Sequence, residues 1–183
     1  MFKPTLTLTA ALLLASQPSQ AACEDSWAIV STACQHIEDT WTEGDSDLYL
    51  PLHAHHLRFA YTDEKIDSFN ENSLGIGYGR SHYLNNGNWE GLYGMAFLDS
   101  HNDIEPMLGY SYQWMWGQQN ALHAGLGYAV FITARSDVMN YIPFPAATPV
   151  ASLNYKKVSI NSTYIPGGSG NGNILFFWSR IGF

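Results

Sequence analysis

The chain has 183 residues, 13% of them charged and 14% aromatic, and a formal net charge of −8 at pH 7. This length favours a single domain, and the excess of acidic groups argues against nucleic acid as a partner. We expect no transmembrane helix, because no part of the chain approaches the roughly 20 consecutive apolar residues that one requires.

The first residues have the pattern of a secretory signal peptide. Lys3 precedes an apolar run over 6–15, and small residues stand at the usual cleavage spacing within 19–21. We therefore expect residues 1–21 to be removed on export.

The two cysteines, Cys23 and Cys34, follow this segment. Along one continuous helix they would lie ~16 Å apart, which is beyond disulfide reach, so a bridge requires Cys23 to lie off the helix. Lipidation of Cys23 is disfavoured, because Gln20 stands where a lipoprotein signal usually carries leucine.

Large apolar residues then recur at spacings of three and four, at Trp27, Val30, Cys34, Ile37 and Trp41. This period predicts an amphipathic helix over about 25–43 that Gly44 ends. Its other side is acidic and lacks the lysines and arginines of helices that bind anionic lipid. Two interpretations stay open, a helix leaning on the rim of the following domain and a simple plug or spacer.

From about residue 48 the chain divides into segments of roughly ten residues separated by turn chemistry, as a small barrel requires. The predicted strands are 51–61, 74–83, 88–98, 104–116, 121–133, 147–155, 157–165 and 174–183. The last of them places Leu175, Phe177, Ile181 and Phe183 on one face, which is typical of a strand facing lipid.

The predicted fold is therefore all-β, an eight-stranded antiparallel transmembrane β-barrel over about 48–183 that follows the N-terminal amphipathic helix. A barrel that follows a signal peptide is expected in the outer membrane. A closed barrel has no free sheet edge to demand a partner, so a monomer is expected.

The predicted faces of the strands suggest an apolar interior. The strand 104–116 carries Tyr110, Tyr112 and Trp114 on its outward face, whereas the inward residues of 121–133 are mostly small. Such an interior can solvate a hydrocarbon chain at ~0.8 kcal/mol per buried CH₂. The alternative is that neighbouring side chains fill the space.

Reactive side chains gather in segments that should reach one rim of the barrel. His56, Asp99, Ser100 and Arg135 belong to strands or strand ends that run toward the same face, so they can form a Ser/His/Asp acyl-transfer site. His53 and His55 share a strand face, but exposed histidines more often face solvent, and we assign no metal.

Prolines also interrupt the predicted strands, for example Pro149 and Pro166. Because proline cannot donate to the ladder, such clusters can mark a lateral gap in the wall. They can equally mark strands that end in loops.

Short collinear motifs resemble the lipid A palmitoyltransferase (PagP) family from about Ile37 to Phe183. The motifs are Asp47-Leu48-Tyr49-Leu50-Pro51, His56 with Arg58-Phe59-Ala60-Tyr61, Gly87-Asn88-Trp89, Phe97-Leu98-Asp99-Ser100, Glu105-Pro106, Thr133-Ala134-Arg135, Asn140-Tyr141-Ile142-Pro143, Pro149-Val150-Ala151-Ser152, Thr163-Tyr164-Ile165-Pro166-Gly167 and Gly170-Asn171-Gly172-Asn173.

The resemblance implies an outer-membrane enzyme that transfers palmitate, or a slightly shorter chain, from the sn-1 position of a phospholipid to lipid A, with no diffusible cofactor. His56, Asp99 and Ser100 match the family's essential residues. We interpret His56 as the general base, Asp99 as the group that orients it, and Ser100 as nucleophile or oxyanion-side donor. Arg135 is a candidate for a lipid phosphate or for a structural salt bridge.

Two positions depart from the family pattern. Ser111 stands where the family typically has glycine at the floor of the acyl pocket, which predicts a shorter preferred chain because a filled core resists added volume. Ser73 replaces a proline near one lipid gateway, while Pro149 and Pro166 match the pair that flanks the other.

Two alternatives belong to other classes. A non-catalytic barrel with a structural or adhesive role should have a polar lumen, and its rim histidines should be dispensable. A periplasmic lipocalin-like carrier would share an apolar lumen but would not need the aromatic outer faces or the terminal Phe183.

Overall fold

The computed structural model describes residues 27–169 and 171–183. The predicted signal peptide and Cys23 lie outside the described residues. The chain divides into two compact units, 1–35 and 36–183. The described part of the first unit is the start of helix α2, Ala28–Glu43, which ends just before Gly44 as predicted. None of the helices in the described ranges is long and apolar enough to cross a membrane.

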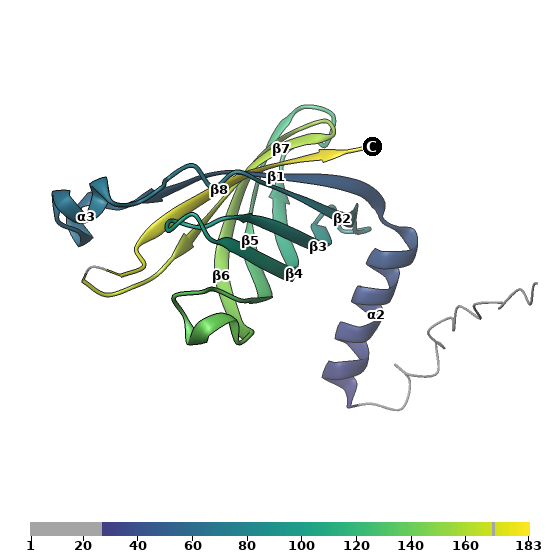
Figure 1. Ribbon diagram of the computed structural model, residues 1–183. Coiled ribbons are helices and arrows are strands. Elements are labelled where there is room, and N and C mark those ends of the chain that lie inside the picture. The colour runs from purple at the N-terminus through teal and green to yellow at the C-terminus, as the bar shows by residue number, and fades with distance from the viewer. Residues whose placement is uncertain (1–26, 170) are drawn as a thin grey trace, which may run out of the picture. The chain divides into compact units, whose positions relative to one another are not determined.

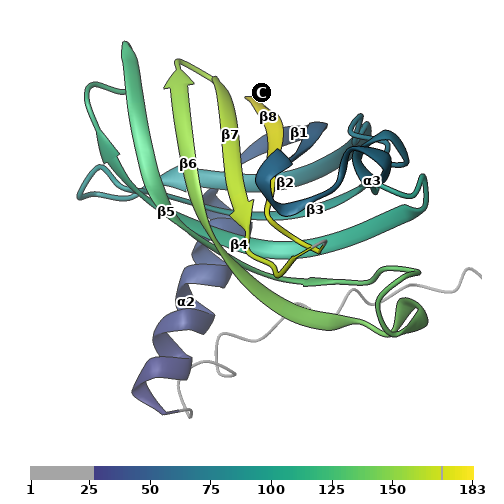
Figure 2. The same cartoon turned by 90° about the vertical axis from the view of Figure 1, so that its left-hand side faces the viewer.

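The second unit is a closed barrel of eight antiparallel strands that follow one another in chain order, which confirms the predicted number and arrangement (Figures 1 and 2). The strands are β1 Asp45–His56, β2 Gly75–Tyr83, β3 Trp89–Leu98, β4 Ile104–Trp116, β5 Leu122–Thr133, β6 Phe144–Tyr155, β7 Val158–Ile165 and β8 Ile174–Gly182. The connections also contain the short helices η1 Arg58–Ala60, α3 Asp63–Asp67 and η2 Met139–Tyr141.

Three strand boundaries, on two strands, were predicted wrongly. The first strand begins at Asp45 and ends at His56, not at 51 and 61. Its start looks like a loop in sequence because it is polar, yet Asp47 faces inward and pairs with Arg180 on the neighbouring strand β8. After His56 the chain leaves the wall through η1. The sixth strand begins at Phe144, three residues earlier than predicted.

The second half of α2 is anchored to the barrel by one buried carboxylate. Glu90 on β3 accepts hydrogen bonds from His36 (2.8 Å) and Thr40 (3.0 Å) on the helix, and from His82 (2.8 Å) and Tyr110 (2.7 Å) on β2 and β4. From His36 onward the helix therefore packs on the barrel, which favours this interpretation over a simple spacer for that part of the chain.

The alternation of faces follows the prediction on β4, β5 and β8, whereas on β3 the face of Trp89, Tyr93 and Phe97, which was expected outside, is buried inside. On β4 and β5 the exposed side chains include Leu108, Trp114, Leu126 and Val130, whereas His123 and Ala129 are buried inside. The inward face of β8 carries Phe176 and Trp178.

The interior is apolar only in part, and the expectation of a mainly small and apolar lumen was incomplete. The apolar core cluster includes Tyr93, Met95, Phe97, Phe176 and Trp178. The remaining interior is polar and internally hydrogen-bonded, through the pairs Asp47–Arg180 (2.9 Å), Asn154–Ser152 (2.8 Å), Asn161–Ser159 (2.9 Å) and Tyr83–His123 (2.8 Å). Buried polar groups are stable only when paired in this way.

Two pairs of neighbouring strands are hydrogen-bonded to each other along only part of their length. The β1–β2 ladder joins Asp45–Tyr49 to 77–81, although β1 pairs with β8 as far as His56. The β6–β7 ladder likewise starts only at Val150, which faces Thr163. The barrel wall therefore has two interrupted seams, which we call the β1–β2 seam and the β6–β7 seam.

The Asp47–Arg180 pair should be a strong determinant of stability. Both side chains are buried, and removing one partner of such a pair typically costs about 3–5 kcal/mol because the other charge is left unpaired. We expect Asp47→Leu to lower the free energy of unfolding by this amount, measured by denaturant titration in detergent. The double variant Asp47→Leu/Arg180→Met should recover most of the loss, and a double variant as unstable as the single one would contradict this account.

Candidate active site

His56 is the last residue of β1 and is held between two aromatic rings. Its ring stacks on Phe69 at a centroid distance of 4.3 Å and meets the edge of Tyr61 at 5.4 Å. Both aromatic residues come from the connection between β1 and β2, which folds back over the strand end. The imidazole is 1% exposed and has one fixed orientation.

Ser100 meets this histidine from the turn after β3. Its Oγ lies 3.0 Å from His56 Nε2. The turn is built by Asp99, whose Oδ1 accepts the backbone N–H groups of His101 (2.8 Å) and Asp103 (2.9 Å), while Asn102 adopts a positive φ of 67°. The chain thus leaves the strand pleat at this point, so the adjacent Asp99 and Ser100 can both face the site.

The carboxylate that contacts His56 is Glu71. Its Oε1 lies 3.2 Å from His56 Nδ1 and accepts the His56 backbone N–H at 2.9 Å. Arg58 donates to both oxygens of the same carboxylate, at 2.8 and 2.9 Å. An Nδ1–H that donates to Glu71 leaves the Nε2 lone pair directed at Ser100, which is the tautomer a general base requires.

Asp99 therefore does not have the expected place beside His56. Its Oδ2 is buried without a hydrogen bond among the described residues, and its neighbours are Arg135 Nη2 at 3.7 Å and His101 Nδ1 at 3.8 Å. Asp99 was expected beside His56 because it follows a strand that runs toward the same rim and because it matches an essential residue of the family. Glu71 was missed because its approach to His56 depends on the path of a long connection.

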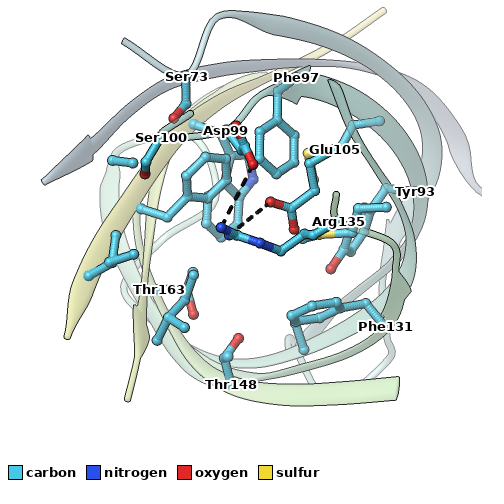
Figure 3. Close-up of a pocket in the computed structure, with 18 residues that line it drawn as sticks. Ser73, Tyr93, Phe97, Asp99, Ser100, Glu105, Phe131, Arg135, Thr148 and Thr163 are labelled. Atoms are coloured by element: carbon cyan, nitrogen blue, oxygen red, sulfur yellow. Dashed lines mark hydrogen bonds and ion pairs between the residues drawn. The ribbon is translucent and has the colours of Figure 1, made fainter. Parts of the chain in front are cut away.

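Arg135 reaches into the interior among three carboxylates. It donates to Asp137 at 2.9 and 3.0 Å and to Glu105 at 3.3 Å, and it faces Asp99 as Figure 3 shows. This guanidinium, with burial opposing it, holds the pKa of Asp137 below its ordinary value. The geometry supports the structural salt-bridge interpretation of Arg135.

Two hollows meet at Ser100 and Arg135. The inner cavity lies inside the barrel (Figure 3) and is lined mainly by apolar side chains such as Met95, Phe97, Met107, Ile165, Phe176 and Trp178. A second hollow, which we call the outer basin, is lined by residues that include His56, Lys65, His101 and Pro166. Ser100 and Arg135 belong to the linings of both hollows.

Of the residues predicted at the pocket floor and the gateways, Ser73 lines the inner cavity, Pro166 lines the outer basin, and Ser111 and Pro149 belong to neither lining. Ser111 is buried on β4 opposite Ala129, which lines the cavity, and its Oγ donates to the Tyr128 carbonyl at 3.0 Å. Pro149 precedes the point where the β6–β7 ladder begins, and Thr163 Oγ1 donates to its carbonyl at 2.7 Å. Ser73 lines the cavity next to the β1–β2 seam.

Two groups of side chains have the composition of metal ligands, with ligand atoms within 4.8 Å of one another: His53, His55 and Glu71, and Asp99, His101 and Asp137. The Glu71 oxygens already accept from Arg58, and Arg135 pairs with Asp99 and Asp137. These arginines oppose a further cation at either place, so we assign no metal.

The structure places the chain in the class of small closed barrels with an internal site. The site is a Ser–His contact at the mouth of a partly apolar interior. The family model described as "Antimicrobial peptide resistance and lipid A acylation protein PagP" matches residues 36–180. The chain belongs to the PagP family.

Curated relatives agree with this assignment. Proteins named "Lipid A acyltransferase PagP" are 56% identical in Methylobacillus flagellatus (93% of each chain), 47% in Bordetella parapertussis (93% of this chain and 94% of the relative) and 43% in Legionella pneumophila (91% and 89%).

The Glu71 carboxyl should titrate far below its ordinary range. Burial alone raises its pKa, but hydrogen bonds from Arg58 and His56 outweigh this effect and lower the pKa to about 2. A free glutamate titrates near ~4.3, so this interaction stabilises the fold above that pH and is lost as the pH falls toward 2.

NMR titration of the Glu71 carboxyl checks this expectation. Arg58→Gln should raise the midpoint, whereas Arg80→Gln, which removes an arginine bonded to the Gly44 carbonyl instead, should not. A midpoint near ~4.3 in the unmodified protein would refute the assignment.

Proposed function

We propose that this protein is an outer-membrane acyltransferase that moves a palmitoyl or slightly shorter chain from the sn-1 position of a phospholipid to lipid A. The observation that carries the proposal is the 3.0 Å contact between Ser100 Oγ and His56 Nε2, at the junction of the apolar inner cavity and the outer basin. There an acyl chain can lie inside while its ester group meets the histidine and serine.

The donor chain would lie in the inner cavity, where each buried CH₂ is stabilised by ~0.8 kcal/mol. The cavity volume is about 40 Å³, whereas one water needs ~10–15 Å³ on the same measure. A long chain must therefore displace side chains. Met95 and Met107 line the cavity, and methionine is flexible enough to move aside.

His56 would act as general base at the ester. In one route it takes the Ser100 proton, Oγ bonds to the ester carbon, and the lysophospholipid oxygen leaves with a proton from the imidazolium. A lipid A hydroxyl then attacks the acyl-serine in the same manner. In the other route His56 deprotonates the lipid A hydroxyl, whose oxygen bonds directly to the ester carbon while Ser100 donates a hydrogen bond to the oxyanion. The lysophospholipid oxygen then leaves with the proton from the imidazolium. Asp99 shapes the Ser100 turn in both routes.

Lipids would reach the site from the bilayer through the wall. Pro149 and Pro166 border the β6–β7 seam, and the Pro149 backbone faces β7, where a missing N–H removes no ladder bond. Ser73 stands at the β1–β2 seam instead of a second proline. Arg135 could hold a lipid phosphate only by exchanging one of its carboxylate partners.

The outer surface supports a place in the outer membrane. Large apolar side chains are exposed around the wall, among them Leu108, Trp114, Leu122, Leu126, Val130, Leu153 and Ile160. Outward apolar residues on alternate positions are what a lipid-facing barrel requires. The closed wall leaves no unpaired sheet edge along most strands, which favours a monomer.

The alternatives fit these observations less well. A non-catalytic barrel would have no use for an apolar chamber beside a buried histidine–serine contact. A soluble lipocalin-like carrier would not expose so many large apolar groups, because monomeric soluble proteins rarely expose large contiguous apolar patches.

Loss of either reacting group should abolish transfer. We expect His56→Ala and Ser100→Ala to lower acyl transfer at least ~100-fold, because a positioned base contributes ~10²–10⁴. The assay uses purified protein, phospholipid and lipid A in mixed micelles, with the product identified by mass spectrometry. His53→Ala, a half-buried histidine on the same strand, is the matched control. An unmodified protein that transfers no acyl chain would refute the proposed function.

Chain length should respond to Ser111. Removing its buried CH₂OH beside Ala129 deepens the end of the cavity, so we expect Ser111→Gly to accept longer chains than the unmodified protein. Competition among phospholipids of different acyl length measures the shift. Ser162→Gly, on the outward face of β7, should leave the profile unchanged, and an unchanged profile in Ser111→Gly would remove Ser111 from the chain-length determinants.

A further inference from the structure

We propose that Glu71, and not Asp99, is the positioning residue of His56, and that the connection carrying Glu71 aligns both halves of the His56–Ser100 pair. The inference rests on the proposed acyl transfer and names a further residue for that reaction.

Glu71 holds His56 at two points. The same oxygen, Oε1, accepts the backbone N–H of His56 at 2.9 Å and lies 3.2 Å from Nδ1. The ring is thus fixed relative to its own backbone, and Nδ1 is the nitrogen that carries the proton. Nε2 is left to accept the hydrogen of Ser100, 3.0 Å away.

Arg58 holds Glu71 in turn. Its two Nη atoms donate to the two carboxylate oxygens at 2.8 and 2.9 Å, and Nη1 also donates to the His56 carbonyl at 3.2 Å. A bidentate arginine–carboxylate pair is the most directional ion pair available to side chains. Because the pKa of Glu71 is about 2, the carboxylate stays ionised at every pH at which the histidine changes charge.

The same connection is also hydrogen-bonded to the turn that carries Ser100. The Asn70 backbone N–H donates to the Ser100 carbonyl at 2.9 Å, and the Asn70 side chain donates to Asn102 Oδ1 at 2.8 Å. The Glu71 carbonyl accepts the Ala54 N–H of β1 at 2.8 Å. Asn70 therefore places Ser100 and Glu71 places His56, from adjacent positions in the chain.

Asp99 is placed for a different task. Its Oδ1 is used by the turn, and its Oδ2 faces Arg135 and His101. The charged or titratable groups that face the His56 ring are Glu71 and Arg58 from the β1–β2 connection and Tyr61 from the same segment. Ser100 faces the ring from the β3–β4 turn.

The proposal predicts a kinetic signature for Glu71→Gln. An amide can donate to Nδ1 and impose the wrong tautomer, and it no longer stabilises the imidazolium. We expect kcat to fall ~10–100-fold, less than the ~10²–10⁴ that the positioned base itself contributes, with KM for the phospholipid little changed. The acid limb of the pH–rate profile should move to lower pH, because the protonated ring loses its anionic neighbour.

Three further variants keep the test specific. Glu71→Asp, which keeps the charge, should restore part of kcat and return the acid limb toward its original position. Glu64→Gln, an exposed carboxylate of the same connection, should behave as the unmodified protein. Arg58→Lys, which keeps the charge but loses the paired contact, should give an intermediate kcat. Circular dichroism in detergent checks folding. If Glu71→Gln fails to fold, the kcat values of Glu71→Asp and Arg58→Lys test the role of Glu71, and unchanged values in both would overturn it.

The outcomes separate the two proposals. An unmodified protein without transferase activity refutes the proposed function. An active unmodified protein together with a Glu71→Gln variant of unchanged kcat and unchanged acid limb refutes the role of Glu71 alone. A loss confined to KM, without a change in the acid limb, also overturns it, because that pattern describes a contact with lipid and not with His56.

Discussion

Closure of the wall by β1 and β8 is the constraint on which the rest of the structure depends. The ladder runs along both strands from Asp47 to His56, with a change of register after Pro51. This ladder keeps β1 in the wall although β1 is no longer paired with β2 beyond Tyr49. An eight-stranded barrel is only wide enough for side chains or one small ligand. The lumen must therefore be filled by side chains or shaped to bind one narrow ligand, and its polar groups must be paired.

The interior meets this constraint with two kinds of filling. Around the Asp47–Arg180 pair the space is packed with polar side chains, most of which are hydrogen-bonded to one another. Beyond the aromatic rings of Tyr93 and Trp178 the lining becomes apolar. A hydrocarbon chain could not displace the first region without leaving buried polar groups unpaired. The polar region therefore acts as a floor, and the apolar region is the part available to an acyl chain.

The site is assembled where that apolar region opens to the surface. His56 comes from the end of β1, Ser100 from the turn after β3, and Glu71 from the β1–β2 connection, which is hydrogen-bonded to both. Arg135 and its carboxylates form a second network nearby, in contact with Asp99. The charged groups at the opening of the apolar region thus form two sets, one around His56 and the other around Arg135.

Strand number, most boundaries and the outward faces of β4, β5 and β8 were readable from the sequence, because side-chain alternation is local and repeats along each strand. The polar half of the lumen was not, since inward polar residues look like loop residues until closure of the barrel brings β1 beside β8 and Asp47 meets Arg180. The partner of His56 was also decided only in three dimensions. Asp99 is adjacent to Ser100 in sequence, but the fold of the connection brings Glu71 to the ring, and side-chain partners depend on where the backbone returns.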